Sequence, residues 1–216
     1  MAYSDKLTDL PLHTLLDRLS SSDPVPGGGS VAAIAGAMGA ALVAMVAELT
    51  IGRADYSEHE LTVRELLAAA LERRQLLLAL AEEDASAYQS VVAARRMPRE
   101  TEPQREARAA ALRTAMIAAA RVPLQVANVA AEVLELASRI APIGNRNAVS
   151  DAGVAAQLSG AALRGALLNV RINLPYLPAD EPLRESAPPE LVRLEAIADE
   201  RERAALAAVD ARLLPS

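Results

Sequence analysis

The stretch "PVPGGGSVAAIAGAMGAALVAMVAELT", residues 24–50, places three consecutive glycines before seventeen residues that carry no polar side chain. Three structures compete for such a segment: a membrane span, a buried packing helix, or a ligand-binding loop mounted on a rigid helix. A span needs about 20 apolar residues, and Ala and Gly contribute little to the free energy of membrane insertion. The segment therefore favours a buried helix, and we expect no membrane association.

Residues 31–47 carry two apolar faces. Bulky side chains recur every three or four residues, and small side chains recur on roughly the opposite side of the helix. Two apolar faces predict burial on both sides. The bulky ridge consists of Ile34, Met38, Leu42, Met45 and Leu49, and the small-residue face consists of Ala33, Gly36, Ala40, Ala44 and Ala47.

The flanking chain predicts further helices. The sequence has no Phe and no Trp, helix-forming Ala and Leu dominate it, and strand-forming residues are sparse. Capping boxes pair Ser57 with Glu60 and Thr101 with Gln104, and a bend is expected at Pro123. Helices are predicted over residues 5–22, 31–47, 57–97, 101–140, 147–173 and 189–213.

These helices predict an all-α, single-domain bundle over residues 1–216, with two buried Ala-rich central helices over 31–47 and 147–173. Hairpin signals and solenoid repeats are absent from the sequence. Central helices with apolar surface on all sides often need a second subunit to cover them. We therefore expect a symmetric homodimer.

Charge and residue usage exclude several classes of protein. The net charge of −6 argues against nucleic-acid binding, which needs a basic surface. The chain has no Cys, and its two histidines, His13 and His59, are far apart, so we expect no metal site. The first ten residues do not have the pattern of a secretory signal, which predicts a cytoplasmic protein.

The glycine run Gly27–Gly29 is the first candidate binding element. Glycines permit positive φ and let a ligand approach the backbone. Ser30 is a candidate N-cap of the next helix, whose free N–H groups favour an anionic or oxygen-rich ligand group. A plain turn between helices is the alternative. The segment is not a P-loop, because no Gly-Lys-Ser/Thr follows.

A second candidate lies in "GNRNAVSDAG", residues 144–153, where Asp151 stands near a helix start. A capping role for Asp151 explains this position equally well. However, Asp151, Asn169 and Asn173 share one azimuth along the helix with several small residues between them. Because buried amides need partners, this stripe favours the wall of a ligand cleft.

Asp84 is the third candidate, and two interpretations of it stay open. It continues an otherwise apolar helical register that includes Tyr88, which would bring a carboxylate to a buried face. It also ends the acidic cluster formed with Glu82 and Glu83, which would leave it in solvent.

Four motifs occur together and in order: "PVPGGGSVAAIAGAMGAALVAMVAELTIGR", "EEDASAYQSVVAARRMP", "ARVPLQVA" and "GNRNAVSDAGVAAQLSGAALRGALLNVRINL". In this combination the chain resembles the cyclodeaminase part of the formiminotransferase-cyclodeaminase family, which includes stand-alone methenyltetrahydrofolate cyclohydrolases. The resemblance extends from about residue 5 to about residue 210.

The resemblance implies a helical homodimer that holds a tetrahydrofolate derivative as substrate in a cleft near the subunit interface. It implies no metal and no permanently bound cofactor. Both family reactions occur at the carbon that joins N5 and N10 of the folate, through ring closure with loss of ammonia or through hydrolytic ring opening. Both need a proton-transfer group beside a cationic centre, and a carboxylate suits this role.

Carried onto this sequence, the resemblance implies Asp151 and Asp84 as the catalytic carboxylates. It leaves open which of them transfers the proton, and the position of Asp151 near a helix start favours Asp151 as the base. Arg53 stands where we expect family members to carry Lys, and it would face the carboxylate tail of the folate. The implied substrate-binding residues are Gly27, Gly28, Gly29, Ser30, Arg53, Asn147, Asn169 and Asn173.

The resemblance leaves cyclodeaminase and cyclohydrolase activity open. A non-catalytic helical folate-binding or scaffold protein that retains the family fold is the alternative from another class. A membrane-associated protein is the third interpretation, and it requires residues 31–47 to be exposed to lipid.

Overall fold

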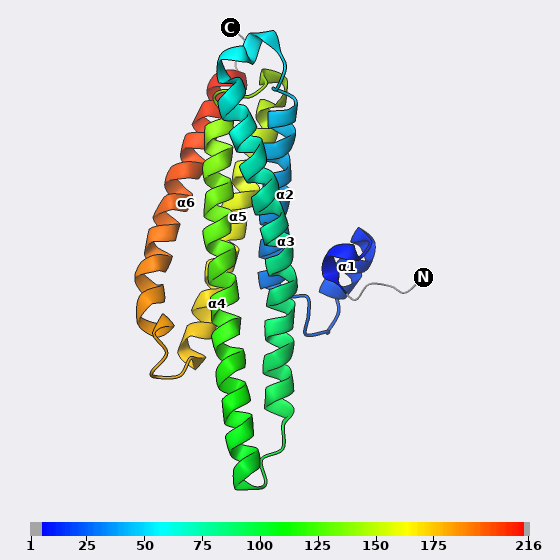
Figure 1. Ribbon diagram of the computed structural model, residues 1–216, viewed down its shortest axis with the longest axis vertical. Coiled ribbons are helices and arrows are strands. Elements are labelled where there is room, and N and C mark those ends of the chain that lie inside the picture. The colour runs from blue at the N-terminus through cyan, green and yellow to red at the C-terminus, as the bar shows by residue number, and fades with distance from the viewer. Residues whose placement is uncertain (1–5, 214–216) are drawn as a thin grey trace.

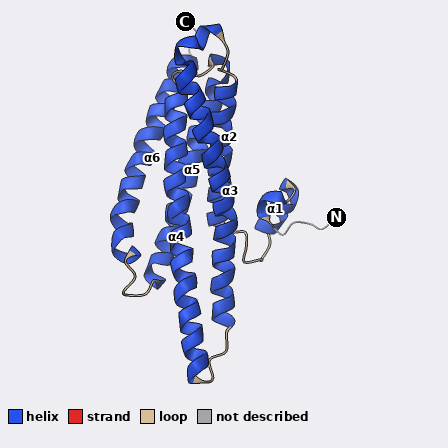
Figure 2. Ribbon diagram, viewed as in Figure 1, coloured by secondary structure: helices blue, strands red, loops and turns tan. Residues whose placement is uncertain are grey.

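The computed structural model describes residues 6–213, and in this range the chain is helical without a β-strand (Figures 1 and 2). The all-α prediction is therefore confirmed. The long helices are α2 (Gly28–Glu48), α3 (Glu60–Arg96), α4 (Glu102–Ile140), α5 (Val149–Asn173) and α6 (Leu183–Leu213), and α1 (Leu12–Leu19) is short. Single turns of 3-10 helix cover Leu7–Asp9, Arg146–Ala148 and Leu174–Tyr176, and a longer one covers Ala54–His59.

The five long helices form one elongated bundle (Figure 1). Helix α2 packs against α3 and α5, helix α4 packs against α3 and α5, and α6 covers α4 and α5. Helices α3 and α4 form a hairpin whose tip projects beyond the other helices (Figure 1). Helix α1 lies to the side of the bundle, where Leu15 packs beside Ala85 of α3.

Several predicted helix bounds are wrong. The first helix, predicted over 5–22, covers only Leu12–Leu19, and residue 5 lies outside the described residues. Helix α2 begins at Gly28 with Gly27 as its N-cap, so Ser30 lies inside the first turn and is not the cap. Helix α3 begins at Glu60, and the Ser57 hydroxyl donates to the carbonyl of Ala54 instead of capping α3. In both cases a 3-10 turn or a glycine takes the place of the expected side-chain cap.

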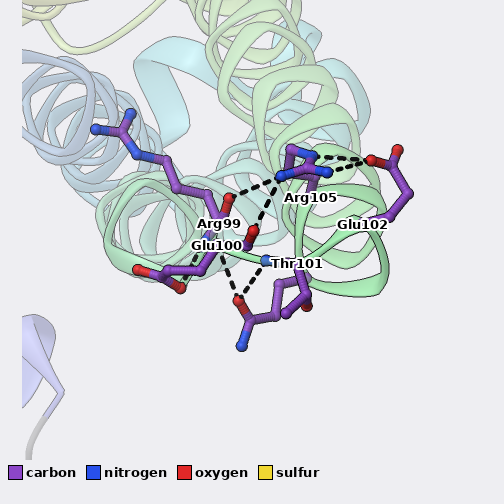
Figure 3. Close-up of polar contacts among 6 residues, drawn as sticks. Arg99, Glu100, Thr101, Glu102 and Arg105 are labelled. Atoms are coloured by element: carbon purple, nitrogen blue, oxygen red, sulfur yellow. Dashed lines mark hydrogen bonds and ion pairs between the residues drawn. The ribbon is translucent and has the colours of Figure 1, made fainter.

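The capping box at the start of α4 is confirmed. The Gln104 side chain accepts a hydrogen bond from the backbone N–H of Thr101 at 3.1 Å, and a neighbouring pair joins Arg105 to Glu102 (Figure 3). Helix α4 then continues through the buried Pro123 to Ile140. Helix α6 begins at Leu183, six residues before the predicted start at 189.

Small residues bring α2 and α5 into close contact. Ala33, Ala40 and Ala47 of α2 are fully buried. A Cβ atom added at Gly39 would lie 3.1 Å from the carbonyl oxygen of Ala155 in α5. Backbone approach of this kind requires glycine or alanine, so the small-residue face of α2 packs as predicted.

The bulky ridge of α2 packs only in part within the chain, where Ile34 and Leu42 contact the core. Met38 is 56% exposed and Met45 is 38% exposed, so the expected burial on both sides is wrong for a single copy. Helix α5 continues this surface with Leu168 and Ile172, which are 62% and 66% exposed. We call this surface the α2–α5 face, formed by Val31, Met38, Met45, Leu49, Val154, Leu168 and Ile172.

Helices α2 and α4 are both long and apolar enough to cross a membrane by length and composition. In each, 61% of the most apolar window is buried inside the bundle. A packed core helix satisfies the same criteria, and the close contact of α2 with α3 and α5 is the packing expected of one.

Candidate active site

Six predicted site residues meet in one pocket. It has a volume of about 260 Å³ and lies between the start of α2, the middle of α3 and α4, and the end of α5. The chain approaches it through a cis peptide bond between Val25 and Pro26. The lining includes Gly27, Gly28, Gly29, Asp84, Asn169 and Asn173.

A partly buried hydrogen bond fixes the carboxyl group of this pocket. The Ser30 hydroxyl, on the first turn of α2, lies 2.9 Å from Asp84 Oδ2 and 3.0 Å from the carbonyl oxygen of Ala81. The backbone N–H of Ser30 also donates to Asp84. The oxygen-rich group expected at this helix start is thus the carboxylate of Asp84 itself, which the free N–H groups of the first turn stabilise.

Asp84 is half-buried, and this decides between its two sequence-based interpretations. Burial raises the pKa of Asp84, and the two hydrogen bonds from Ser30 only partly oppose that effect. A carboxyl group with a raised pKa can both hold and release a proton nearer to neutral pH. Such a group inside a pocket is a candidate for acid–base chemistry.

Space, and not backbone conformation, explains Gly29, whereas a Cβ atom at Gly27 would meet nothing within 4 Å. None of Gly27–Gly29 has a positive φ; among the described residues only Gly52 does. A Cβ atom at Gly29 would lie 2.6 Å from Cγ of Asp84, whereas one at Gly28 would lie 3.5 Å from Asn169 Nδ2. The positive φ that glycine permits is therefore not used in this run, and Gly29 is the position where a side chain would displace the carboxyl group.

The two asparagines orient their amides against the backbone. Asn169 Nδ2 donates to the carbonyl of Gly165 at 2.9 Å. Asn173 Nδ2 donates to the carbonyls of Ala119 at 2.8 Å and Asn169 at 2.9 Å. Within the described chain nothing donates to either side-chain oxygen, so both oxygens remain acceptors for a ligand that enters the pocket.

Asp151, Asn147 and Arg53 lie at the opposite end of the bundle. Asp151 is the third residue of α5, which confirms its predicted place near a helix start. Eighteen residues separate it from Asn169, a distance of about 27 Å along the helix. The backbone N–H of Asn147 donates to Asn145 Oδ1, and Arg53 is exposed beside the 3-10 turn over Ala54–His59.

The predicted continuous wall along α5 is wrong within one chain. Between Asp151 and Asn169 the stripe contains Ala155 and Ala162, and both are buried in the contact with α2. A helix–helix contact therefore fills the middle of the stripe. The role of Asp151 as a base stays a prediction.

Tyr88 and Ala119 line the pocket and were not predicted as site residues. Tyr88 follows Asp84 by four residues on α3, and this spacing places both side chains on one face. That spacing was a usable signal. Ala119 reaches the pocket from α4 only through tertiary packing, so no local pattern marks it.

A larger groove of about 500 Å³ lies between α3, α4 and α6. Each of its three arginines is paired with a glutamate: Arg73 with Glu132, Arg193 with Glu190, and Arg201 with Glu135. A groove of satisfied ion pairs offers a ligand few free groups. The smaller pocket around Asp84 is therefore the better candidate site.

Burial of Asp84 predicts a pH-dependent effect of Asp84→Asn on stability. In the folded protein the pKa of Asp84 is raised above its ordinary value of 3.8. Protonation of Asp84 therefore contributes to the free energy of unfolding, and this contribution is fully present below pH 3.8. It is lost as the pH rises through the raised folded pKa. The amide does not titrate, so the variant is expected to gain thermal stability over the wild type as the pH rises from acid to neutral.

Unfolding temperatures of both proteins across this pH range measure the difference. Asp151→Asn serves as the matched control, since it removes another half-buried carboxylate outside the pocket. A difference between Asp84→Asn and wild type that stays constant with pH would contradict the raised pKa.

Comparisons with known proteins identify the family to which the chain belongs. A sequence profile of the family described as formiminotransferase-cyclodeaminase matches residues 11–191. The methenyltetrahydrofolate cyclohydrolase of Methylorubrum extorquens is 43% identical over 178 residues, which cover 81% of this chain and 86% of that protein. The formimidoyltransferase-cyclodeaminase of Sus scrofa is 36% identical over 76% of this chain, but the match covers only 30% of that protein.

A solved structure of formiminotetrahydrofolate cyclodeaminase from Thermotoga maritima has the same fold. It superposes with a TM-score of 0.84 at 29% sequence identity, covering 97% of this chain and all of that one. The chain therefore belongs to the formiminotransferase-cyclodeaminase family. The resemblance seen in the four motifs is confirmed.

Proposed function

We propose that this chain is a folate one-carbon enzyme, and that the pocket around Asp84 holds the carbon joining N5 and N10 of a tetrahydrofolate derivative. The half-buried Asp84 carboxyl group, with its raised pKa and its hydrogen bonds to Ser30, carries the proposal. The names of the relatives support this substrate class, and nothing supports a non-catalytic scaffold. The absence of a permanently bound cofactor and the cytoplasmic location stay predictions.

The charge of the substrate fits a carboxyl group of this kind. The methenyl form carries a cationic amidinium between N5 and N10. A cation close to Asp84 favours the ionised carboxylate. Substrate binding therefore lowers a pKa that burial raises in the free protein, and it leaves a base and counter-charge beside the reacting carbon.

Hydrolysis then follows from one proton acceptor. Water attacks the methenyl carbon, a C–O bond forms, and Asp84 accepts the proton that water loses. One C–N bond of the ring breaks, the departing nitrogen receives the proton from Asp84, and the new hydroxyl loses its own proton to become the formyl oxygen. One proton is released for each turnover, and the Ser30 hydroxyl keeps the carboxylate oriented throughout.

We favour cyclohydrolase over cyclodeaminase activity. The cyclohydrolase relative is 43% identical over most of its own length, whereas the cyclodeaminase of Thermotoga maritima is 29% identical over all of its length, so the preference rests on the higher identity. The absorbance of methenyltetrahydrofolate tests the choice. A fall with methenyl substrate is expected, a rise with formimino substrate would indicate the cyclodeaminase, and no change with either would overturn the proposal.

A homodimer is part of the proposal. The α2–α5 face is apolar and exposed, and Leu12 and Leu16 of α1 add exposed leucines. Leu168 is the neighbour of the pocket residue Asn169 in the chain, so a second copy on this face would lie beside the pocket. A two-fold axis perpendicular to α5 would also bring the Asp151 end of one copy toward the Asn169 end of the other.

Assembly through this face predicts a specific disruption. Met38→Glu is expected to convert a dimer into a monomer, because a carboxylate at the centre of an apolar interface is unpaired and desolvated. Light scattering should give about twice 22.7 kDa for the wild type and 22.7 kDa for the variant. Val192→Glu on α6, also at an exposed apolar position, is the control and should remain dimeric. A monomeric wild type would contradict the proposal.

A further inference from the structure

The α3–α4 hairpin carries two arginines on the face that continues the pocket. Arg95 follows Asp84 by eleven residues on α3, and Arg108 precedes Ala119 by eleven residues on α4. Eleven residues are close to three helical turns, so each arginine shares the azimuth of its pocket residue about 16 Å farther along the helix. Asp84 and Ala119 line the same pocket on antiparallel helices, so Arg95 and Arg108 lie at the same level.

This part of the hairpin is locally basic. Residues 95–108 contain five arginines and three glutamates in a chain whose net charge is −6. The positive charges of neighbouring arginines repel one another. A bound anion would reduce this electrostatic repulsion.

Some arginines of the hairpin and its surroundings are already paired. Arg105 is paired with Glu102 at the tip (Figure 3), and Arg113 binds Asp180 through two hydrogen bonds of 2.7 and 3.0 Å. Arg95 is exposed and, like the exposed Arg96 and Arg99, has no ion pair within residues 6–213, but of these three only Arg95 shares the azimuth of Asp84. The Nε atom of Arg108 is buried without a hydrogen-bond partner in the same range.

An unpartnered buried donor in a native structure calls for an explanation. An anionic ligand supplies one, because a guanidinium group binds carboxylates through strong, oriented hydrogen bonds. Arg95 adds a second free cation at the same level of the hairpin.

Tyr88 lies between the pocket and the two arginines. It is one turn beyond Asp84 on α3 and is 45% exposed. A partly exposed aromatic ring offers a surface on which another aromatic ring can stack. The face thus presents, in order, a carboxyl group, an aromatic ring and a pair of cations.

We propose that Arg95 and Arg108 bind the carboxylates of the glutamate at the end of the folate substrate, with its aminobenzoyl ring against Tyr88. The inference rests on the proposed function, and it replaces the predicted contact of the tail with Arg53, which lies at the opposite end of the bundle. In the substrate, an aromatic ring, an amide and the glutamate follow one another from N10, the same order of chemistry that the face presents. The two arginines are substrate-positioning residues, since they lie far from the reacting carbon.

The test combines two arginine variants with two substrates. Arg95→Met/Arg108→Met removes both cations, and Arg96→Met is the matched control. Arg96 carries the same charge on the same exposed turn of α3 but points about 120° away from the pocket azimuth. The substrates are methenyltetrahydrofolate with one glutamate and the corresponding pteroate, which lacks the glutamate.

For the glutamate-bearing substrate, the double variant is expected to raise KM about tenfold and to change kcat by less than about twofold. For the pteroate, its KM should equal that of the wild type, and Arg96→Met should match the wild type on both substrates. Unfolding temperatures check that each variant is folded.

Equal changes in KM for both substrates, or the same change in Arg96→Met, would overturn the inference while leaving the proposed function standing. If the wild type converted neither the methenyl nor the formimino substrate, both proposals would fall. The two failures are therefore distinguishable in one set of assays.

Discussion

Asp84→Asn is expected to lower kcat for methenyltetrahydrofolate by about 10²–10⁴, the usual cost of losing a general base. The amide is nearly isosteric and can still accept the hydrogen bond that Ser30 donates at 2.9 Å, so the pocket keeps its shape. It cannot accept the proton of the attacking water or balance the charge of the substrate cation. Turnover should therefore fall while helical circular dichroism stays unchanged.

Asp151→Asn is the matched comparison, because the sequence alone also indicated this carboxylate. In one chain Asp151 lies about 27 Å from Asn169 along α5, outside the pocket. We expect its loss to cost far less turnover than the loss of Asp84. A collapse of turnover in Asp151→Asn with near-normal Asp84→Asn would reverse the two assignments and would require a site completed by the second copy.

Gly29→Ala is expected to have the second largest effect. Its new Cβ atom would lie 2.7 Å from Oδ2 of Asp84, so the carboxyl group must move. A displacement of about 1 Å at a reacting group can cost about 10²-fold in rate, and we expect a loss of that order in kcat/KM.

Gly28→Ala controls for the loss of a glycine in the same turn of α2. Its Cβ atom would meet only Asn169, with Nδ2 at an ordinary contact distance of 3.5 Å. The variant should therefore keep most of the activity. Equal losses in the two variants would show that the flexibility of the loop matters, and not the space beside Asp84.

Much of the fold could be predicted from local patterns. The Ala- and Leu-rich segments form the expected helices, and the small-residue face of α2 packs against α5. The helix starts at Gly28 and Glu60 were not predicted, because a glycine and a 3-10 turn replaced the side-chain caps that the sequence offered.

The site was harder to predict, since it depends on which helices meet. The azimuth of Asp151, Asn169 and Asn173 was read without knowing that α2 covers the middle of that stripe. The contact between Ser30 and Asp84 joins residues 54 positions apart, so no local pattern contains it. The exposure of Met38 also depends on the assembly, which one sequence does not define.

The most direct test of the central claim is the pH dependence of kcat/KM for methenyltetrahydrofolate hydrolysis, followed by absorbance, in wild type and Asp84→Asn. Burial raises the pKa of Asp84, so the wild-type rate should increase with pH as that group ionises, with its midpoint above the ordinary value of 3.8. Asp84→Asn should lack this increase with pH and retain only a low rate. An increase of the same size and with the same midpoint in Asp84→Asn would contradict Asp84 as the proton-transfer group.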